Sequence, residues 1–216
     1  MITLYAFKWV PPFAHGLVRD LRVRWALEEA GLPYQERLIG LEDRSSPVYR
    51  AVQPFGQVPA IEDGDLTLFE SGAIVLHIGK RSDTLLPKDD DARARAVNWV
   101  FAALNTMEVA IQALSELSIF HASEEWAKLR KPGLEQKVRL RLSELAARLD
   151  DRDYLDGRFT AGDMMMTSVL RILNGTGLLE EQPRLDAYTK RCEARPAFRR
   201  ALDAQLASFA KHAPAA

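Results

Sequence analysis

The chain has 216 residues, of which 47% are hydrophobic and 27% are charged, and its formal net charge at pH 7 is −1. This length and composition allow one or two buried cores and do not resemble those of a disordered chain. The near-zero charge gives no field that would attract nucleic acid, so we expect Arg19, Arg22 and Arg24 to solvate a helix face.

Neither a membrane span nor a targeting segment is predicted. No apolar run approaches the roughly 20 residues that a spanning helix needs, and the start Met1-Ile-Thr-Leu lacks a charged region ahead of an apolar one. We therefore expect a cytoplasmic protein with no membrane or nucleic-acid partner. A disulfide and a metal site are not expected either, because Cys192 is the only cysteine and the histidines are far apart.

Strand and helix patterns alternate in the N-terminal part of the chain. Residues 1–7 predict a buried strand, and residues 34–39 predict a second one. Between them, residues 21–30 have apolar side chains at the spacing of an amphipathic helix, which Gly31 and Pro33 end.

The most informative stretch is Gln-Pro-Phe-Gly-Gln-Val-Pro at residues 53–59. Pro59 opens an apolar run although proline has no N–H for a sheet, so we expect a cis Val58–Pro59 bond at the start of a strand. The backbone N–H and C=O of Val58 would then be open to an extended peptide. Another strand is predicted over residues 66–69, after an Asp-Gly hairpin turn.

A helix is predicted to begin at Ser71, directly after Glu70. We expect Ser71 to cap this helix, with the N–H groups of Gly72 and Ala73 beside its hydroxyl, which is a common way to bind a carboxylate. Together with Val58, these groups predict a cradle for a peptide that carries a carboxylate.

Helical patterns dominate the remainder of the chain after a polar connector at residues 82–91. Apolar residues predict a long helix over residues 99–114 and another over residues 134–149. Thr160 and Asp163 form a capping box at the start of a further helix, and we expect them to stabilise folding without taking part in chemistry.

The pattern N/Q-P-x-G-x-V-P followed by E-S resembles the glutathione S-transferase family. Leu-Arg-Val-Arg-Trp-Ala-Leu-Glu-Glu looks like the first helix of that family, and residues 154–163 resemble its second-domain cap, with Gly162 where alanine is common. The resemblance implies a thioredoxin-like α/β domain at residues 1–80, a linker at 81–91, an all-helical domain at 92–216, and a homodimer.

The resemblance also implies that the cradle binds glutathione. The backbone of Val58, next to Pro59, would pair with the peptide, Glu70 would hold the γ-glutamyl ammonium and Ser71 its carboxylate. The glycine carboxylate would meet Arg44 or Gln57, although the run around Arg44 also suits a solvated turn.

Catalysis would require a group that favours the thiolate of glutathione over its thiol. Relatives use a tyrosine at the end of the first strand, or a serine or cysteine near the first helix, where this chain has Val18 or Arg19. Tyr5 is therefore the candidate donor. The loop after the first strand is longer than in relatives, so His15, Trp9 or a backbone N–H are alternatives; the loop could equally cover a hydrophobic edge or a partner subunit.

The function that follows is a glutathione transferase of detoxification, in which the thiolate attacks a small hydrophobic electrophile, a disulfide or a peroxide. An isomerase of the maleylacetoacetate type is one alternative, but its Ser-Ser-Cys segment is missing. A non-catalytic scaffold protein with the same fold is another alternative. The pocket for the second substrate is expected at Trp9, Pro11, Phe13, Met107 and Glu108.

Overall fold

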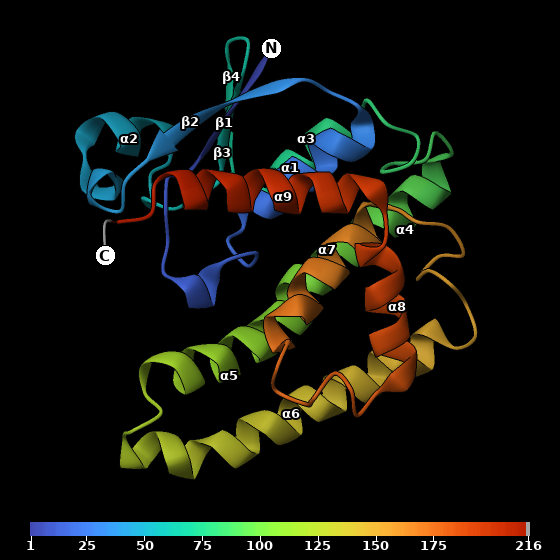
Figure 1. Cartoon of the computed structure of the whole chain (residues 1–216). Coiled ribbons are helices and arrows are strands. Elements are labelled where there is room, and N and C mark those ends of the chain that lie inside the picture. Colours follow the sequence, from blue (N-terminus) through green and yellow to red (C-terminus); the bar gives the residue numbers. More distant parts are fainter. Residues whose placement is uncertain (215–216) are drawn as a thin grey trace. The chain divides into compact units, whose positions relative to one another are not determined.

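The computed structural model describes residues 1–214 and contains two compact units (Figure 1). Unit 1 consists of Met1–Leu86 together with Arg195–Ala216, and unit 2 consists of Pro87–Ala194. The C-terminal segment therefore differs from its expected place in a domain spanning 92–216, because its helix packs against the first helix of unit 1. Within residues 1–214, no helix has the length and hydropathy that a membrane crossing requires.

A four-stranded sheet forms the centre of unit 1. The strands are β1 (Ile2–Phe7), β2 (Tyr34–Ile39), β3 (Ala60–Asp63) and β4 (Leu66–Phe69), in the order β2-β1-β3-β4. β1 is parallel to β2, whereas β3 is antiparallel to both β1 and β4. This is the predicted thioredoxin-like arrangement, and the apolar sequence of β1 agrees with its central position.

The described part of unit 1 also contains the helices α1 (Asp20–Ala30), α2 (Pro47–Val52), α3 (Ser71–Gly79) and α9 (Pro196–Lys211). Short 3-10 turns, η1 (Pro12–Ala14) and η2 (Glu42–Ser45), lie in the loops. α1 contacts both α3 and α9, so it is covered on two sides.

The arginines of α1 are not on a solvated face, contrary to the expectation from sequence. Arg22 and Arg24 are buried. The guanidinium of Arg24 donates from Nε to Asp20 Oδ2 at 2.7 Å and also bonds Glu36. Paired charges can be buried in this way, and the neighbouring helices exclude water from both sides of α1.

Unit 2 is helical, as predicted. Its elements are α4 (Asp90–Phe101), the π-helical segment η3 (Ala102–Glu108), α5 (Val109–Phe120), α6 (Glu125–Leu149), α7 (Ala161–Leu170), the 3-10 turn η4 (Arg171–Leu173) and α8 (Pro183–Glu193). The predicted helix at 99–114 is thus a continuous helical run with a π-helical middle, a feature often found at functional sites.

The capping box that opens α7 is confirmed. The side chain of Thr160 accepts from the N–H of Gly162 at 3.2 Å, and Asp163 Oδ2 accepts from the N–H of Thr160 at 2.9 Å. Gly162 has a packing reason, since a Cβ there would lie 2.4 Å from Cβ of Trp99. Glycine therefore permits close approach of α7 to α4.

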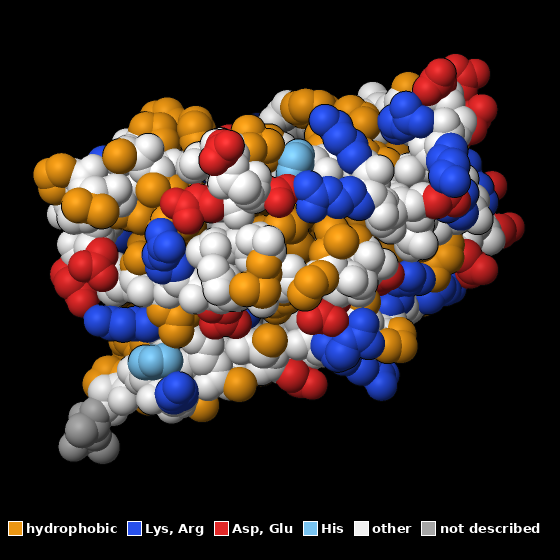
Figure 2. Space-filling model, turned by 90° about the horizontal axis from the view of Figure 1, so that it is seen from above, with side chains coloured by type: hydrophobic (Ala, Val, Ile, Leu, Met, Phe, Trp, Pro, Cys, Tyr) orange, Lys and Arg blue, Asp and Glu red, His pale blue; other side chains and the backbone are white. Residues whose placement is uncertain are grey.

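The surface carries charges of both signs. On the face shown in Figure 2, acidic and basic side chains are interspersed, in line with the formal net charge of −1.

Candidate functional site

The loop before β3 is fixed by the side chain of Gln53, which is 2% exposed. Its Oε1 accepts from the backbone N–H of Phe55 at 2.7 Å and from that of Gln57 at 3.2 Å. The first residue of the Gln-Pro-Phe-Gly-Gln-Val-Pro motif thus serves as an internal cap for the loop. Its amide oxygen accepts hydrogen bonds from backbone N–H groups that have no backbone partner in this irregular segment.

Arg44 supports the same loop, and its predicted contact with glutathione stays a prediction. Its Nε donates to the carbonyl of Gly56 at 2.9 Å. Gly56 has φ +63, and a Cβ there would lie 2.5 Å from the carbonyl of Arg44, so glycine is required. Tyr49 adds a third support by donating to the carbonyl of Gln57 at 2.5 Å.

The bond between Val58 and Pro59 is cis, as predicted. The ladder of β3 begins at Ala60, which pairs with Tyr5 on one side and Phe69 on the other. The backbone of Val58 therefore lies outside the registered strand pairs, next to the first pair of the sheet.

The N-terminus of α3 follows β4 directly. The helix begins at Ser71, as predicted, but Ser71 is its first helical residue and not its cap; the N-cap residue is Glu70, with φ 68 and ψ 112. The first helical bond runs from the N–H of Ile74 to the carbonyl of Glu70 at 3.0 Å. The N–H groups of Ser71, Gly72 and Ala73 precede that bond, as helix geometry requires, and form the positive end of the helix dipole.

Arg22 places a positive charge beside this helix end, and the sequence analysis missed it. Its Nη1 donates to Ser71 Oγ at 3.3 Å, and both side chains are buried. The sequence did indicate that Arg22 is buried, because Trp25 and Ala26 follow it by three and four residues and therefore lie on the same face of the helix. Both of these are buried, so that face could not be solvated.

The hydroxyl of Tyr5 is engaged inside the sheet. It donates to Glu62 Oε1 at 2.7 Å and accepts from Arg37. In the pairing of β1 with β3, Tyr5 lies opposite Ala60, and Glu62 is two residues further along β3. To reach Glu62, the Tyr5 side chain must therefore lean away from the Pro59 end of β3. Burial and the hydrogen bond to Glu62 raise the pKa of Tyr5, so the phenol stays protonated at neutral pH.

The loop after β1 is closed by His15. The ring Nε2 donates to the carbonyl of Val10 at 2.9 Å, because a carbonyl can only accept, and the ring stacks on Phe209 of α9 at 5.1 Å. In the same loop Trp9 and Pro11 are half-buried, while Phe13 is 54% exposed.

The predicted second-substrate residues belong to two units. Trp9, Pro11 and Phe13 are part of unit 1, whereas Met107 and Glu108 are buried residues of unit 2. The pocket that combines them stays a prediction.

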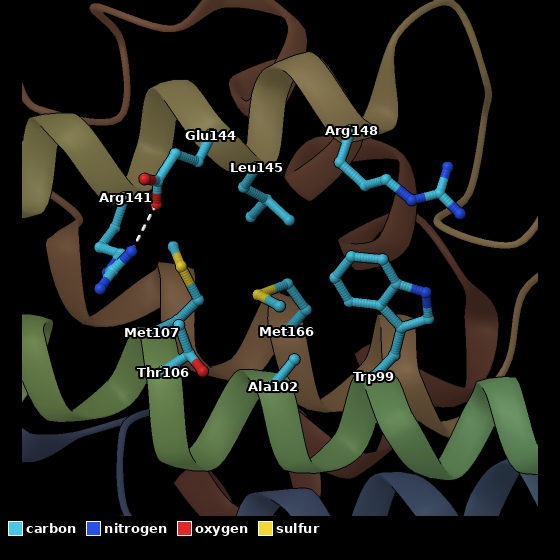
Figure 3. Close-up of a pocket in the computed structure, with 9 residues that line it drawn as sticks. All are labelled: Trp99, Ala102, Thr106, Met107, Arg141, Glu144, Leu145, Arg148 and Met166. Atoms are coloured by element: carbon cyan, nitrogen blue, oxygen red, sulfur yellow. Dashed lines mark hydrogen bonds and ion pairs between the residues drawn. The ribbon is translucent and has the colours of Figure 1, made fainter.

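Unit 2 contains a cavity of about 140 Å³ of its own between α4, η3, α6 and α7. Figure 3 shows Met107, Met166 and Leu145 pointing into it. At its rim, Arg148 lies over the ring of Trp99 at 5.7 Å, and Arg141 pairs with Glu144 at 2.6 Å. Its lining is almost wholly apolar. Across residues 1–214, no three His, Cys, Asp or Glu side chains gather as a metal ion would require.

Comparison with known proteins gives consistent matches. A family model described as the N-terminal domain of glutathione S-transferase matches residues 9–80. A glutathione S-transferase from Silene vulgaris is 31% identical over 88% of this chain and 96% of its own length. A probable glutathione S-transferase from Oryza sativa is 34% identical over 75% and 78%, respectively.

Among solved structures, a glutathione transferase from Burkholderia graminis is similar, with a TM-score of 0.82 and 26% identity. The match covers 94% of this chain and 87% of that one, and that protein was crystallised with two glutathione molecules bound per subunit.

Proposed function

This chain belongs to the glutathione S-transferase family, and we propose that it binds glutathione at the N-terminus of α3 in unit 1. The observation that carries the proposal is Ser71 at the first position of α3, with the guanidinium of Arg22 3.3 Å from its hydroxyl. A helix N-terminus with a neighbouring cation suits a carboxylate. The family is that of glutathione transferases, and neither the isomerase nor the scaffold alternative is favoured.

We assign the parts of glutathione as follows. The γ-glutamyl carboxylate is held by Ser71 and by the first N–H groups of α3, and its ammonium by Glu70. The cysteinyl residue pairs with the backbone of Val58, and the glycine carboxylate meets Gln57. In this assignment Arg44 acts only by holding Gly56 in place.

The activating group is proposed to come from the loop of residues 8–19 and not from Tyr5. The one proton of the Tyr5 hydroxyl is directed to Glu62. The loop leads into the N-terminus of α1, whose dipole favours an anion, and contains His15. There the thiol loses its proton to solvent water, and the thiolate sulfur forms a bond to an electrophilic carbon as the leaving group departs with its electron pair. Trp9, Pro11 and Phe13 would contact a hydrophobic electrophile.

Tyr5→Phe should therefore leave the thiol chemistry almost unchanged. We expect kcat/KM and its pH dependence to stay within about twofold of the wild type, while losing the bond to Glu62 lowers stability by about 1 kcal/mol. Conjugation assays across pH and urea unfolding would check this. A rise in the pKa of bound glutathione on this substitution would return the activating role to Tyr5.

The direct test of the proposed function is a calorimetric titration of the wild-type protein with glutathione at neutral pH. Saturable binding, with release of a proton when the thiol ionises, is the expected result. No heat of binding at millimolar-scale glutathione would contradict the proposed site.

Disulfide reduction is a second candidate reaction, favoured by the Burkholderia graminis relative with two bound glutathione molecules. One glutathione thiolate would attack a disulfide sulfur and expel a thiolate, and a second glutathione would resolve the mixed disulfide. The products are glutathione disulfide and two thiols. Comparing turnover of an aryl halide with that of 2-hydroxyethyl disulfide would distinguish the two reactions.

We further propose a cytoplasmic homodimer that acts in detoxification. Phe55 supports the dimer, because its side chain is 62% exposed although its loop is fixed by Gln53. A rigid exposed aromatic side chain is typical of an interface anchor. Phe55→Ser should weaken the dimer at least about tenfold in sedimentation experiments, whereas Val48→Ser, at a still more exposed apolar residue of α2, should not.

A further inference from the structure

The C-terminal helix α9 packs along α1 (Figure 1). Near the end of α1, Arg195 makes a bidentate ion pair with Glu29, with N···O distances of 2.6 and 2.8 Å. Phe198 packs edge-on against Trp25, with ring centroids 4.8 Å apart. These contacts fix the first half of α9 to the last turns of α1.

The second half of α9 contacts the other end of α1 through Gln205, a fully buried side chain. Its Nε2 donates to Asp20 Oδ1 at 2.8 Å and to the carbonyl of Val18 at 3.2 Å. Both partners can only accept, so the orientation of the amide is fixed. Gln205 thereby attaches α9 to the end of the loop, at Val18, and to the first residue of α1, Asp20.

Phe209, one helical turn further along α9, reaches the middle of the same loop. It is 1% exposed and stacks on the His15 ring, with centroids 5.1 Å apart and the planes inclined by 30°. His15 in turn donates to the carbonyl of Val10. α9 therefore holds the loop at two places, its middle and its end.

The amide at position 205 satisfies two acceptors at the cost of one unsatisfied atom of its own. Its Oε1 is buried and has no hydrogen-bond partner among the described residues. An apolar side chain in the same place would remove that cost but would leave Asp20 Oδ1 and the carbonyl of Val18 without this donor. What the amide provides is a directed attachment of Val18 and Asp20, and locally unfavourable groups of this kind are typical of functional sites.

We propose that Gln205 and Phe209 are positioning residues for the transferase reaction. They hold the loop of residues 8–19 in the conformation that stabilises the glutathione thiolate, and they act through the loop without contacting glutathione. This inference rests on the proposed function, in which the loop supplies the activating group. Small displacements of such a group are costly, since a misplacement of about 1 Å can slow a reaction about a hundredfold.

The test compares Gln205→Leu and Phe209→Leu with the wild type and with Arg200→Gln. Arg200 is a matched control, because it also joins α9 to α1, through Glu28 at 2.6 Å, but at the end remote from the loop. For each protein we would measure the pKa of bound glutathione from the pH dependence of kcat/KM for the electrophile at saturating glutathione, the glutathione Kd by calorimetry, and the free energy of unfolding.

We expect both leucine variants to raise the pKa of bound glutathione by about one unit, which lowers kcat/KM about tenfold at pH values below that pKa. Their glutathione Kd should stay within about twofold, because the α3 cradle is untouched. Arg200→Gln should leave both the pKa and the Kd unchanged. If Gln205→Leu does not fold, Gln205→Asn, which keeps the amide but shortens its reach, replaces it and should show the same shift.

An unchanged pKa in the folded Gln205 and Phe209 variants would overturn the inference and leave the proposed function standing. A wild-type protein that fails to bind glutathione, or binds it without lowering its thiol pKa, would instead overturn the proposed function. The two failures are thus distinguishable in one set of measurements.

Discussion

Ser71→Asp should weaken glutathione binding at least about a hundredfold, or by about 2.8 kcal/mol. The new carboxylate would lie at the first position of α3, beside the guanidinium of Arg22 that is 3.3 Å from Ser71 Oγ. It would occupy the place that we assign to the γ-glutamyl carboxylate and repel that group. An aspartate in the first turn also favours the helix dipole, so the fold should not be weakened. Calorimetry with glutathione and urea unfolding would measure the two effects.

The matched control is Ser46→Asp. Ser46 caps α2, where its side chain accepts from the N–H of Tyr49 at 3.2 Å, and aspartate is an equally good cap. The control adds the same charge at another helix N-terminus and should bind glutathione normally. If Ser71→Asp bound glutathione as tightly as Ser46→Asp does, the carboxylate would not lie at α3.

Asp163→Ala should lower the free energy of unfolding by at least about 3 kcal/mol. Asp163 Oδ1 accepts from the N–H of Leu155 at 2.9 Å and from the hydroxyl of Tyr188 at 3.0 Å, and Oδ2 accepts from the N–H of Thr160. Alanine would leave these donors without their acceptor in a buried region. Urea unfolding would measure the loss.

Asp186→Ala is the control, because the side chain of Asp186 on α8 has Lys190 as its only ion-pair partner within residues 1–214, at 2.7 Å. Its removal should cost less than about 1 kcal/mol. If both variants lowered the free energy of unfolding equally, the buried hydrogen bonds of Asp163 would contribute no more than a surface ion pair.

The effect of Asp163 should also depend on pH. Burial raises its pKa above the unfolded value, although hydrogen bonds from Leu155 and Thr160 act in the opposite direction. A carboxyl with a raised folded pKa contributes most below its unfolded value of about 3.9 and loses that contribution as the pH rises through the folded value. The difference between wild type and Asp163→Ala should therefore be larger at acidic than at neutral pH.

Features that depend on neighbouring residues could be predicted from the sequence. The cis bond before Pro59, the start of α3 near Ser71 and the capping box of Thr160 and Asp163 each depend on a few consecutive residues. The alternation of patterns before residue 80 indicated the four strands, α1 and α3 but not α2 (Pro47–Val52), and the resemblance to the glutathione S-transferase family identified their order as thioredoxin-like. Local chemistry decides these features, so one sequence suffices.

Features that depend on distant parts of the chain could not be predicted in this way. Arg24 is buried because Asp20 and Glu36 pair with it, and Glu36 comes from another element. The hydroxyl of Tyr5 finds Glu62 on β3, which no spacing in the sequence indicates. For Arg22, the helical spacing with Trp25 and Ala26 indicated a buried face. The prediction instead followed the basic character of the residue, which is typical of a solvated face.

The return of α9 to unit 1 has a consequence for synthesis on the ribosome. Residues 1–86 emerge first, yet the side chain of Trp25 and the carboxylate of Glu29 must wait for Phe198 and Arg195, which are made more than a hundred residues later. Until then the nascent N-terminal part exposes the apolar face of α1 that α9 later covers. A ribosome that stops within unit 2 would therefore leave an incomplete first unit, because α9 would not yet have been made.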